Sequence, residues 1–117
     1  MENLHIKLTP YEIISMGPSA GILEMVKDSV TLADLKKNIY ENYEEIKDLN
    51  KFFEVFYGPS LKKAQNNFIQ SLVGYSLVCY FLQIKDRHNG NILLHKEGQI
   101  IHIDFGFFLS NAPGKLY

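Results

Sequence analysis

The stretch from residue 61 to residue 84 constrains the fold more than any other part of the chain. One set of its residues recurs every three or four positions, which is the spacing of one face of an α-helix. These residues are Ala64, Phe68, Leu72, Tyr75, Ser76 and Cys79. From Leu72 onward the predicted helix is apolar nearly all round, and Ser60 is placed to cap it. A helix of this kind needs neighbours on several sides, so we expect it to be central in a larger helical layer.

Short strands and shorter helices account for most of the remaining chain. Strands are predicted at residues 5–8, 11–14, 22–26, 91–94 and 99–103. The second and third form one hairpin, whose second strand we expect to be buried, and the last two form another. Helices are predicted at 32–40, capped by Thr31, and at 51–57. Because these elements follow no regular βαβ order, they predict an α+β fold.

The composition excludes several classes of protein. With 117 residues the chain is one domain or a piece of one, and its net charge of −1 argues against a nucleic-acid-binding surface. Its longest apolar run, residues 72–84, is shorter than the roughly 20 residues of a membrane-spanning helix, so any membrane contact is expected to be peripheral. Cys79 is the single cysteine and lies among apolar residues, which is typical of a buried structural thiol.

Residues suited to binding metal and phosphate gather in two segments joined by the second predicted hairpin. Asp86 lies five positions before Asn91, which is the spacing of the catalytic Asp and metal-binding Asn in protein kinases. The tripeptide Asp104-Phe105-Gly106 matches the metal-binding tripeptide of those enzymes. Mg²⁺ prefers oxygen ligands and takes few carboxylates from the protein. Asn91 and Asp104 therefore predict a Mg²⁺ site for a phosphoryl-transfer reaction.

The order of residues in the first segment departs from protein kinases. His88 follows the acid, in Asp86-Arg87-His88, where protein kinases have His-Arg-Asp. An imidazole has an ordinary pKa near 6.5, so His88 is suited to exchange a proton with a substrate hydroxyl. The alternative is that His88 only braces the loop by hydrogen bonds. We expect His102, on the strand before Asp104, to be structural.

Two stretches carry a resemblance to a known family. Residues 85–94, KDRHNGNILL, and residues 101–107, IHIDFGF, resemble the signature of the phosphatidylinositol 3- and 4-kinases. Residues 74–84 and 107–110 are most similar to type III phosphatidylinositol 4-kinases of the beta kind. The resemblance implies a partial protein-kinase-like (lipid kinase) fold. Residues 1–28 would be the end of the N-lobe and the hinge, and residues 29–117 an incomplete C-lobe.

The same resemblance implies roles for individual residues, with ATP and Mg²⁺ as cofactors. The implied catalytic residues are Asp86, Arg87 and His88, with Arg87 bracing the loop. The implied metal ligands are Asn91 and Asp104. The implied adenine hinge is Glu24, Met25 and Val26, in a segment that we would otherwise interpret as a core strand. The implied activation loop, which contacts the lipid headgroup, includes Phe105, Gly106 and Lys115.

The implied reaction transfers the ATP γ-phosphate to the inositol 4-hydroxyl of phosphatidylinositol, giving phosphatidylinositol 4-phosphate. Lys115 is the one cation in residues 107–117, which favours a lipid without further phosphates. A phosphatidylinositol 3-kinase or related kinase, and a non-catalytic truncated product, stay open as alternatives. The implied location is cytoplasmic and peripheral, on intracellular membranes of the Golgi type.

The family's phosphate-binding loop and ATP-binding lysine have no counterpart in this sequence. The glycine-rich turn at residues 17–21 lacks both G-x-G-x-x-G and a Walker sequence, and Lys7 lies too close to the implied hinge. We therefore expect that the chain does not turn over ATP alone. We also expect it to expose apolar surface around the 72–84 helix, and to associate or partly unfold in isolation.

Overall fold

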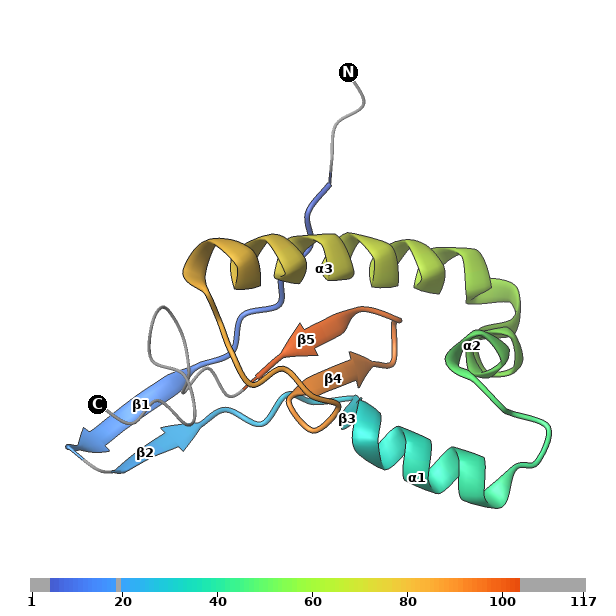
Figure 1. The fold of residues 1–117 in the computed structure, drawn as a ribbon, viewed down its shortest axis with the longest axis horizontal. Helices are drawn as coiled ribbons and strands as arrows, with labels where there is room; N and C mark the ends of the chain where they lie inside the picture. Colours follow the sequence, from blue (N-terminus) through green and yellow to red (C-terminus); the bar gives the residue numbers. More distant parts are fainter. Residues whose placement is uncertain (1–4, 19, 104–117) are drawn as a thin grey trace.

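A computed structural model describes residues 5–18 and 20–103 of the chain. The predicted site residues Asp104, Phe105, Gly106 and Lys115 lie outside this described part, as does the predicted loop at 107–117. Within it, helices and antiparallel strands are mixed, which agrees with the predicted α+β class. A separate hairpin lies at one side, and a three-stranded sheet lies below the longest helix (Figure 1).

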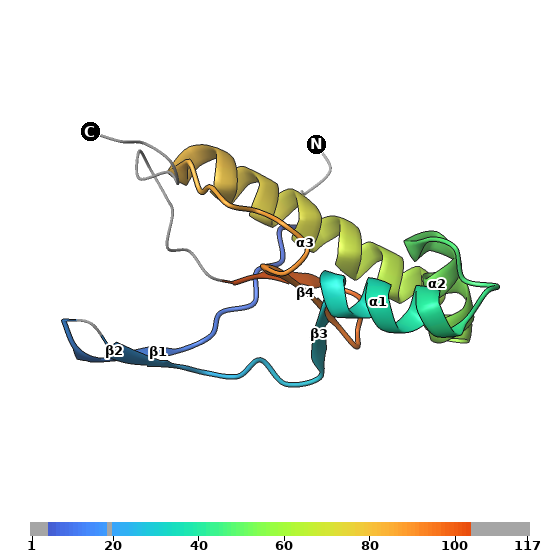
Figure 2. The same cartoon turned by 60° about the horizontal axis from the view of Figure 1, so that its bottom comes forward.

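The first hairpin consists of β1 (Ile13–Gly17) and β2 (Ala20–Leu23). The hairpin was predicted correctly, although both strands are displaced by about two residues from their predicted bounds. The prediction that its second strand is buried is wrong. Ile22 and Leu23 are exposed, and Met25 is 85% exposed. The reason is visible in Figure 2, where the hairpin extends away from the helices and packs against no other described element.

No strand forms at residues 5–8, which is a second correction. This segment runs instead along the longest helix. The Lys7 backbone N–H donates to the Gln70 carbonyl oxygen at 3.5 Å, and Lys7 Nζ donates to Asn67 Oδ1 at 3.3 Å. A Cβ atom on Gly74 would lie 2.7 Å from a methyl carbon of Ile6. The absence of a side chain at position 74 therefore allows the segment to pack against the helix. The segment does not form a strand, because no described strand lies beside it there.

The second sheet has three antiparallel strands in the order β3 (Ser29–Thr31), β4 (Ile92–His95) and β5 (Ile100–His102). The pairing of β4 with β5 is the predicted hairpin, and Leu93 faces Ile101 in its register. Strand β3, whose Val30 pairs with Leu94, was not predicted from the sequence. At the β4–β5 turn, Gly98 has a φ of +100°, and a Cβ there would lie 2.5 Å from the Ala64 carbonyl oxygen. Only glycine fits at this position.

The two shorter helices begin at side-chain caps. Thr31 caps α1 (Leu32–Asn42), as predicted, because its Oγ1 accepts from the Asp34 N–H at 3.0 Å. Helix α2 (Leu49–Tyr57) begins two residues before the predicted start, because Asp48 Oδ1 accepts from the Lys51 N–H at 2.8 Å. A single 3₁₀ turn, Gly58–Ser60, follows it.

The longest helix, α3 (Leu61–Leu82), ends two residues before the predicted bound. Ser60 makes no capping hydrogen bond, so its predicted role is wrong. The face marked by the helical spacing is not buried throughout, because Leu72 is 44% exposed and Ser76 is exposed. The side chains of α3 that are buried belong to Ala64, Asn67, Ser71 and Tyr75. Ser71 is buried because its Oγ accepts from the Ile100 N–H at 2.9 Å and so joins the helix to β5.

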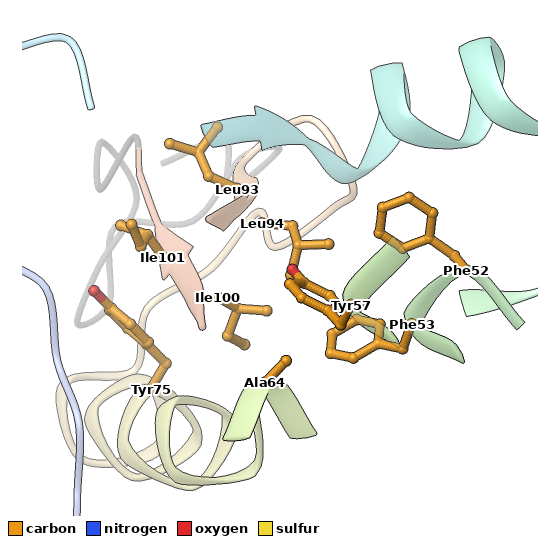
Figure 3. Close-up of a cluster of buried hydrophobic side chains, with 9 residues drawn as sticks. All are labelled: Phe52, Phe53, Tyr57, Ala64, Tyr75, Leu93, Leu94, Ile100 and Ile101. Carbon is orange, nitrogen blue, oxygen red and sulfur yellow. The ribbon is translucent and has the colours of Figure 1, made fainter. Parts of the chain in front are cut away.

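The hydrophobic core lies between α2, α3 and the three-stranded sheet (Figure 3). It is formed by Phe52, Phe53, Tyr57, Ala64, Tyr75, Leu93, Leu94, Ile100 and Ile101. The opposite side of α3 is open among the described residues, with Tyr80 77% and Phe81 72% exposed. The expectation of exposed apolar surface on this helix is therefore confirmed. Among the described residues α3 is not surrounded by other helices, as a central position in a helical layer would require.

Within residues 5–18 and 20–103, no helix has the length and apolarity needed to cross a membrane.

Candidate active site

The loop between α3 and β4 carries four of the predicted site residues, Asp86, Arg87, His88 and Asn91. It begins after Gln83, whose left-handed backbone (φ 50°) ends the helix. Asp86 is also left-handed, with a φ of 60°, a conformation that aspartate adopts more readily than most residues. This turn aims the Asp86 carbonyl oxygen at Asn91, which donates to it through Nδ2. The two residues that were paired by their spacing are therefore in direct contact.

His88 lies across the same loop with its side chain exposed. Its Nδ1 is 3.1 Å from the Gly90 N–H, and its Nε2 is 3.0 Å from Asn91 Nδ2 and 3.7 Å from Asp86 Oδ1. A neutral imidazole has one unprotonated nitrogen, so it accepts from Gly90 or from Asn91 but not from both. With the proton on Nε2, the ring keeps the Gly90 bond and presents its N–H to the Asp86 carboxylate.

The glycine at position 90 is required by the ring of His88. A Cβ at Gly90 would lie 2.9 Å from Cε1 of His88 and 3.0 Å from its Nδ1. Because a side chain at position 90 would push the imidazole out of place, Gly90 belongs to the site. The sequence analysis missed it, although its position directly between Asn89 and Asn91 in the loop was a signal.

Arg87 ties the loop to the end of β5. Its Nη1 donates to the Ile103 carbonyl oxygen at 2.7 Å, and its Nε donates to the Lys85 carbonyl oxygen at 3.2 Å. The Ile103 N–H in turn donates to the Asn91 carbonyl oxygen at 2.9 Å. Both peptide groups of Ile103 are thus held by loop residues, and Asp104 follows in the sequence, outside the described residues.

Asn91 is buried, and its side-chain amide is held at its nitrogen end. Its Nδ2 is engaged by Asp86, whereas no described residue hydrogen-bonds to its Oδ1. One amide oxygen together with one carboxylate is a donor set that suits Mg²⁺, which completes its octahedron with water and substrate phosphate. The described residues contain no group of three His, Cys, Asp or Glu side chains that could hold a metal by itself. The other predicted ligand, Asp104, lies outside them.

The predicted hinge, Glu24 to Val26, follows β2 and borders a cavity of about 660 Å³. The Glu24 N–H donates to the Glu12 carbonyl oxygen at 2.8 Å, and Glu24 Oε2 accepts from the Glu12 N–H at 2.9 Å. By contrast, no described residue hydrogen-bonds to the Glu24 carbonyl oxygen or the Val26 N–H. These two backbone groups are therefore free to pair with a ligand at the cavity's edge.

The cavity joins the predicted hinge to the loop side of the molecule. Its apolar walls come from Leu23, Met25, Val26, Val30, Leu93 and Ile103. Ile103 is the residue whose carbonyl oxygen and N–H are held by Arg87 and Asn91, so the cavity ends beside the loop that carries Asp86 and Asn91. Ser29, Thr31 and Asp34 add polar groups to the wall. None of these three was predicted to line a site, and Thr31 and Asp34 were assigned only to the start of α1.

His102 lies on the opposite side of β5 from the cavity, and its surroundings fit a structural role. Its ring is buried and stacks on Tyr75, with ring centroids 4.7 Å apart. Burial, aided by the positive charge of Arg87, lowers the pKa of His102 to about 4, so the ring is neutral. Cys79 Sγ lies 3.6 Å from its Nδ1, and burial raises the pKa of this thiol. Neither group is poised for chemistry at neutral pH.

Comparisons with known proteins place the chain in a family. Residues 1–117 match the family model of phosphatidylinositol 3- and 4-kinases. The chain is similar to phosphatidylinositol 4-kinase beta 1 of Arabidopsis thaliana, with 48% identity over 114 residues. It is also similar to phosphatidylinositol 4-kinase of Dictyostelium discoideum, with 48% identity over 117 residues, and to phosphatidylinositol 4-kinase beta of Sorex araneus, with 42% identity over 118.

These alignments cover 95%, 97% and 98% of this chain, but only 10%, 10% and 14% of the respective relatives. The chain thus spans about a tenth of the length of the curated relatives it matches. On the family match over the whole chain and on these identities, the chain belongs to the phosphatidylinositol 3- and 4-kinase family.

Proposed function

We propose that this chain forms part of the catalytic domain of a phosphatidylinositol 4-kinase. In the reaction, the γ-phosphate of ATP passes to the inositol 4-hydroxyl of phosphatidylinositol. One observation carries the proposal: the cavity beside the hinge and the loop of Asp86 and Asn91 meet at Ile103. A nucleotide whose base lies at the hinge would have its phosphates near the predicted metal ligands. The names of the relatives support the choice of the 4-hydroxyl.

The division of the chain is part of the same proposal. Residues 1–28 would form the end of the N-lobe and the hinge, and residues 29–117 an incomplete C-lobe of a protein-kinase-like fold. The β1–β2 hairpin packs against no other described element, which supports this division for the hairpin. Residues 6–9, which precede it, lie against α3 and would be the part of the first unit that contacts the second.

The geometry suggests a distinct role for each loop residue. His88 would accept the proton of the inositol hydroxyl at Nδ1, giving up the hydrogen bond from the Gly90 N–H, and the Asp86 carboxylate 3.7 Å from its Nε2 would stabilise the imidazolium that results. Arg87 would hold the loop against the end of β5. Asn91, with its amide oriented by Asp86, would hold Mg²⁺ together with Asp104. When bound, the metal neutralises charge on the transferring phosphoryl group.

The substrates follow from the same assignment. The adenine of ATP would pair with the Glu24 carbonyl oxygen and the Val26 N–H, with Met25 between them at the cavity wall. Phe105, Gly106 and Lys115 would belong to the segment that meets the lipid headgroup. Because phosphatidylinositol is a membrane lipid, the working enzyme must meet a membrane surface. We propose a peripheral, cytoplasmic location on intracellular membranes of the Golgi type, on the strength of the family resemblance.

A chimera tests the proposal in the setting of a complete kinase. The 114 matching residues of Arabidopsis phosphatidylinositol 4-kinase beta 1 would be replaced by this chain, and transfer of ³²P from ATP to phosphatidylinositol vesicles measured. We expect phosphatidylinositol 4-phosphate as the product. Asp104→Asn and His88→Gln should each lower kcat by roughly a hundredfold or more, since they remove a metal ligand and the proton acceptor.

The matched control is Glu45→Gln, which makes the same change from carboxylate to amide in an exposed residue of the α1–α2 connection. It should leave the rate unchanged. A product phosphorylated at the 3-hydroxyl would replace the proposal by a 3-kinase. A chimera that binds ATP but transfers no phosphate would favour a non-catalytic module. Full activity in Asp104→Asn would contradict the assigned metal site.

A further inference from the structure

Tyr75 joins three parts of the molecule that are distant in sequence. Its hydroxyl donates to the Thr9 carbonyl oxygen at 3.1 Å and accepts from the Thr9 N–H at 3.3 Å. Its ring is buried in the middle of α3. The same ring stacks on His102 at the end of β5, with an interplanar angle of 8°. One side chain therefore contacts the segment that leads into the hinge hairpin, the long helix and the last residue of the sheet.

The stack on His102 fixes the strand end that the site uses. His102 is buried, and its Nδ1 lies 3.6 Å from Cys79 Sγ, so the imidazole has little freedom to move. The next residue is Ile103, whose carbonyl oxygen and N–H are held by Arg87 and Asn91. The end of β5 is thus held by an aromatic ring on one side and by the loop on the other. Asp104 comes one residue later in the sequence.

We propose that Tyr75 is a positioning residue for phosphoryl transfer: its ring holds His102, and thereby sets the end of β5 from which the chain continues to Asp104. This inference rests on the proposed function. It differs from ordinary core packing in what it predicts. A side chain that only fills the core contributes to stability, whereas a positioning residue also sets the rate and the Mg²⁺ requirement of the folded enzyme.

The test uses two substitutions in the chimera described above. Tyr75→Phe keeps the stacked ring and loses the two bonds to Thr9, and Tyr75→Leu loses the ring as well. Assays run well below the melting temperature of each variant. We expect Tyr75→Leu to lower kcat by roughly ten- to a hundredfold and to raise the Mg²⁺ concentration for half-maximal rate. Tyr75→Phe should keep kcat within about threefold of that of the unsubstituted chimera, and it should still lower the melting temperature.

A double substitution checks that Tyr75 acts through His102. His102→Leu removes the same stack from the other side, so it should show the same loss of kcat and the same Mg²⁺ shift. The pair Tyr75→Leu/His102→Leu should then lose no more than either single variant. Should Tyr75→Leu fail to fold, His102→Leu alone measures the effect. The control, Tyr43→Leu, changes an exposed tyrosine and should alter neither quantity.

Two outcomes overturn the inference. In one, Tyr75→Leu and His102→Leu lower the melting temperature with kcat and the Mg²⁺ requirement unchanged, so the ring only packs. In the other, the losses of the two variants add fully, so the residues act independently. Failure of the proposed function has a different signature, because the chimera would then be inactive before any substitution, or would keep its activity in Asp104→Asn.

Discussion

Single residues show where the chemistry of this chain depends on local geometry. Asp86 and Asn91 were paired from their spacing alone, and the structure brings the Asp86 carbonyl oxygen into contact with the Asn91 amide. The left-handed backbone of Asp86 produces this contact. The spacing of a motif thus predicted which residues meet, but the backbone conformation that makes them meet has no separate signal in the sequence.

Tyr57 gives a prediction about alkaline pH. Burial raises the pKa of its hydroxyl to about 12, and this hydroxyl donates to the His95 carbonyl oxygen at 3.1 Å. In the unfolded chain the ordinary pKa is near 10, so the unfolded state loses this proton first. The stability is complete below about pH 10 and is lost as the pH rises towards 12. Urea unfolding should show a loss of about 1 kcal/mol from this residue between pH 8 and pH 11.

The comparison of variants isolates this effect from the other groups that titrate at high pH. Tyr57→Phe should have a smaller decrease in the free energy of unfolding between these two pH values than the unsubstituted chain. Tyr43→Phe, which changes an exposed tyrosine, should keep the original decrease. Equal decreases in all three proteins would show that the Tyr57 hydroxyl ionises freely in the folded state.

At the scale of helices and strands, features that depend on neighbouring residues were predicted correctly, whereas pairing between distant segments was not. Helix α1 begins at Thr31 as predicted, because a cap is a local hydrogen bond. Strand β3 was missed because its three residues form a strand only by pairing with β4, far along the chain. Helical spacing did not identify Ser71 as a buried residue of α3. Ser71 is buried because its Oγ accepts from the Ile100 N–H, and helical spacing gives no sign of this partner.

The residues that directly precede α2 and α3 offer a matched test of capping. Asp48 accepts from the Lys51 N–H, whereas Ser60 makes no capping bond to α3. Asp48→Ala should therefore lower the free energy of unfolding by about 1 kcal/mol, measured by urea unfolding. Ser60→Ala should change it by less than about 0.5 kcal/mol. An equal loss in the two variants would contradict the assignment of the caps.

Across the whole described molecule, apolar residues remain exposed on the β1–β2 hairpin and on the outer side of α3. These two regions include Ile13, Ile14, Met16, Leu23, Met25, Tyr80 and Phe81. Large exposed apolar patches on a soluble protein promote association. The sequence predicted this surface on α3, because that helix is apolar nearly all round, but it did not predict it on the hairpin, whose second strand was expected to be buried.

This surface should make the purified chain associate as its concentration rises. Sedimentation should show the mean mass increasing with concentration, and an apolar dye should bind. The double variant Tyr80→Lys/Phe81→Gln should reduce both, with little change in the free energy of unfolding, because these side chains are 77% and 72% exposed. Lys36→Gln, on the exposed side of α1, is the control and should change neither. A strictly monomeric chain that binds no dye would contradict the prediction.

The close approach of Gly98 to α3 has a consequence for how sequences of this family diverge. Lys96 and Glu97 lie in the same turn with exposed side chains, and the ion pair of Lys96 with Asp28 lies at the surface. A side chain at position 98 would instead meet the Ala64 backbone, which no substitution at position 64 removes. An alignment of orthologues should therefore show an unchanging glycine inside a variable surface turn. A glycine conserved in this way could be mistaken for a functional residue. Its conservation would instead result from the packing of the β4–β5 turn against α3.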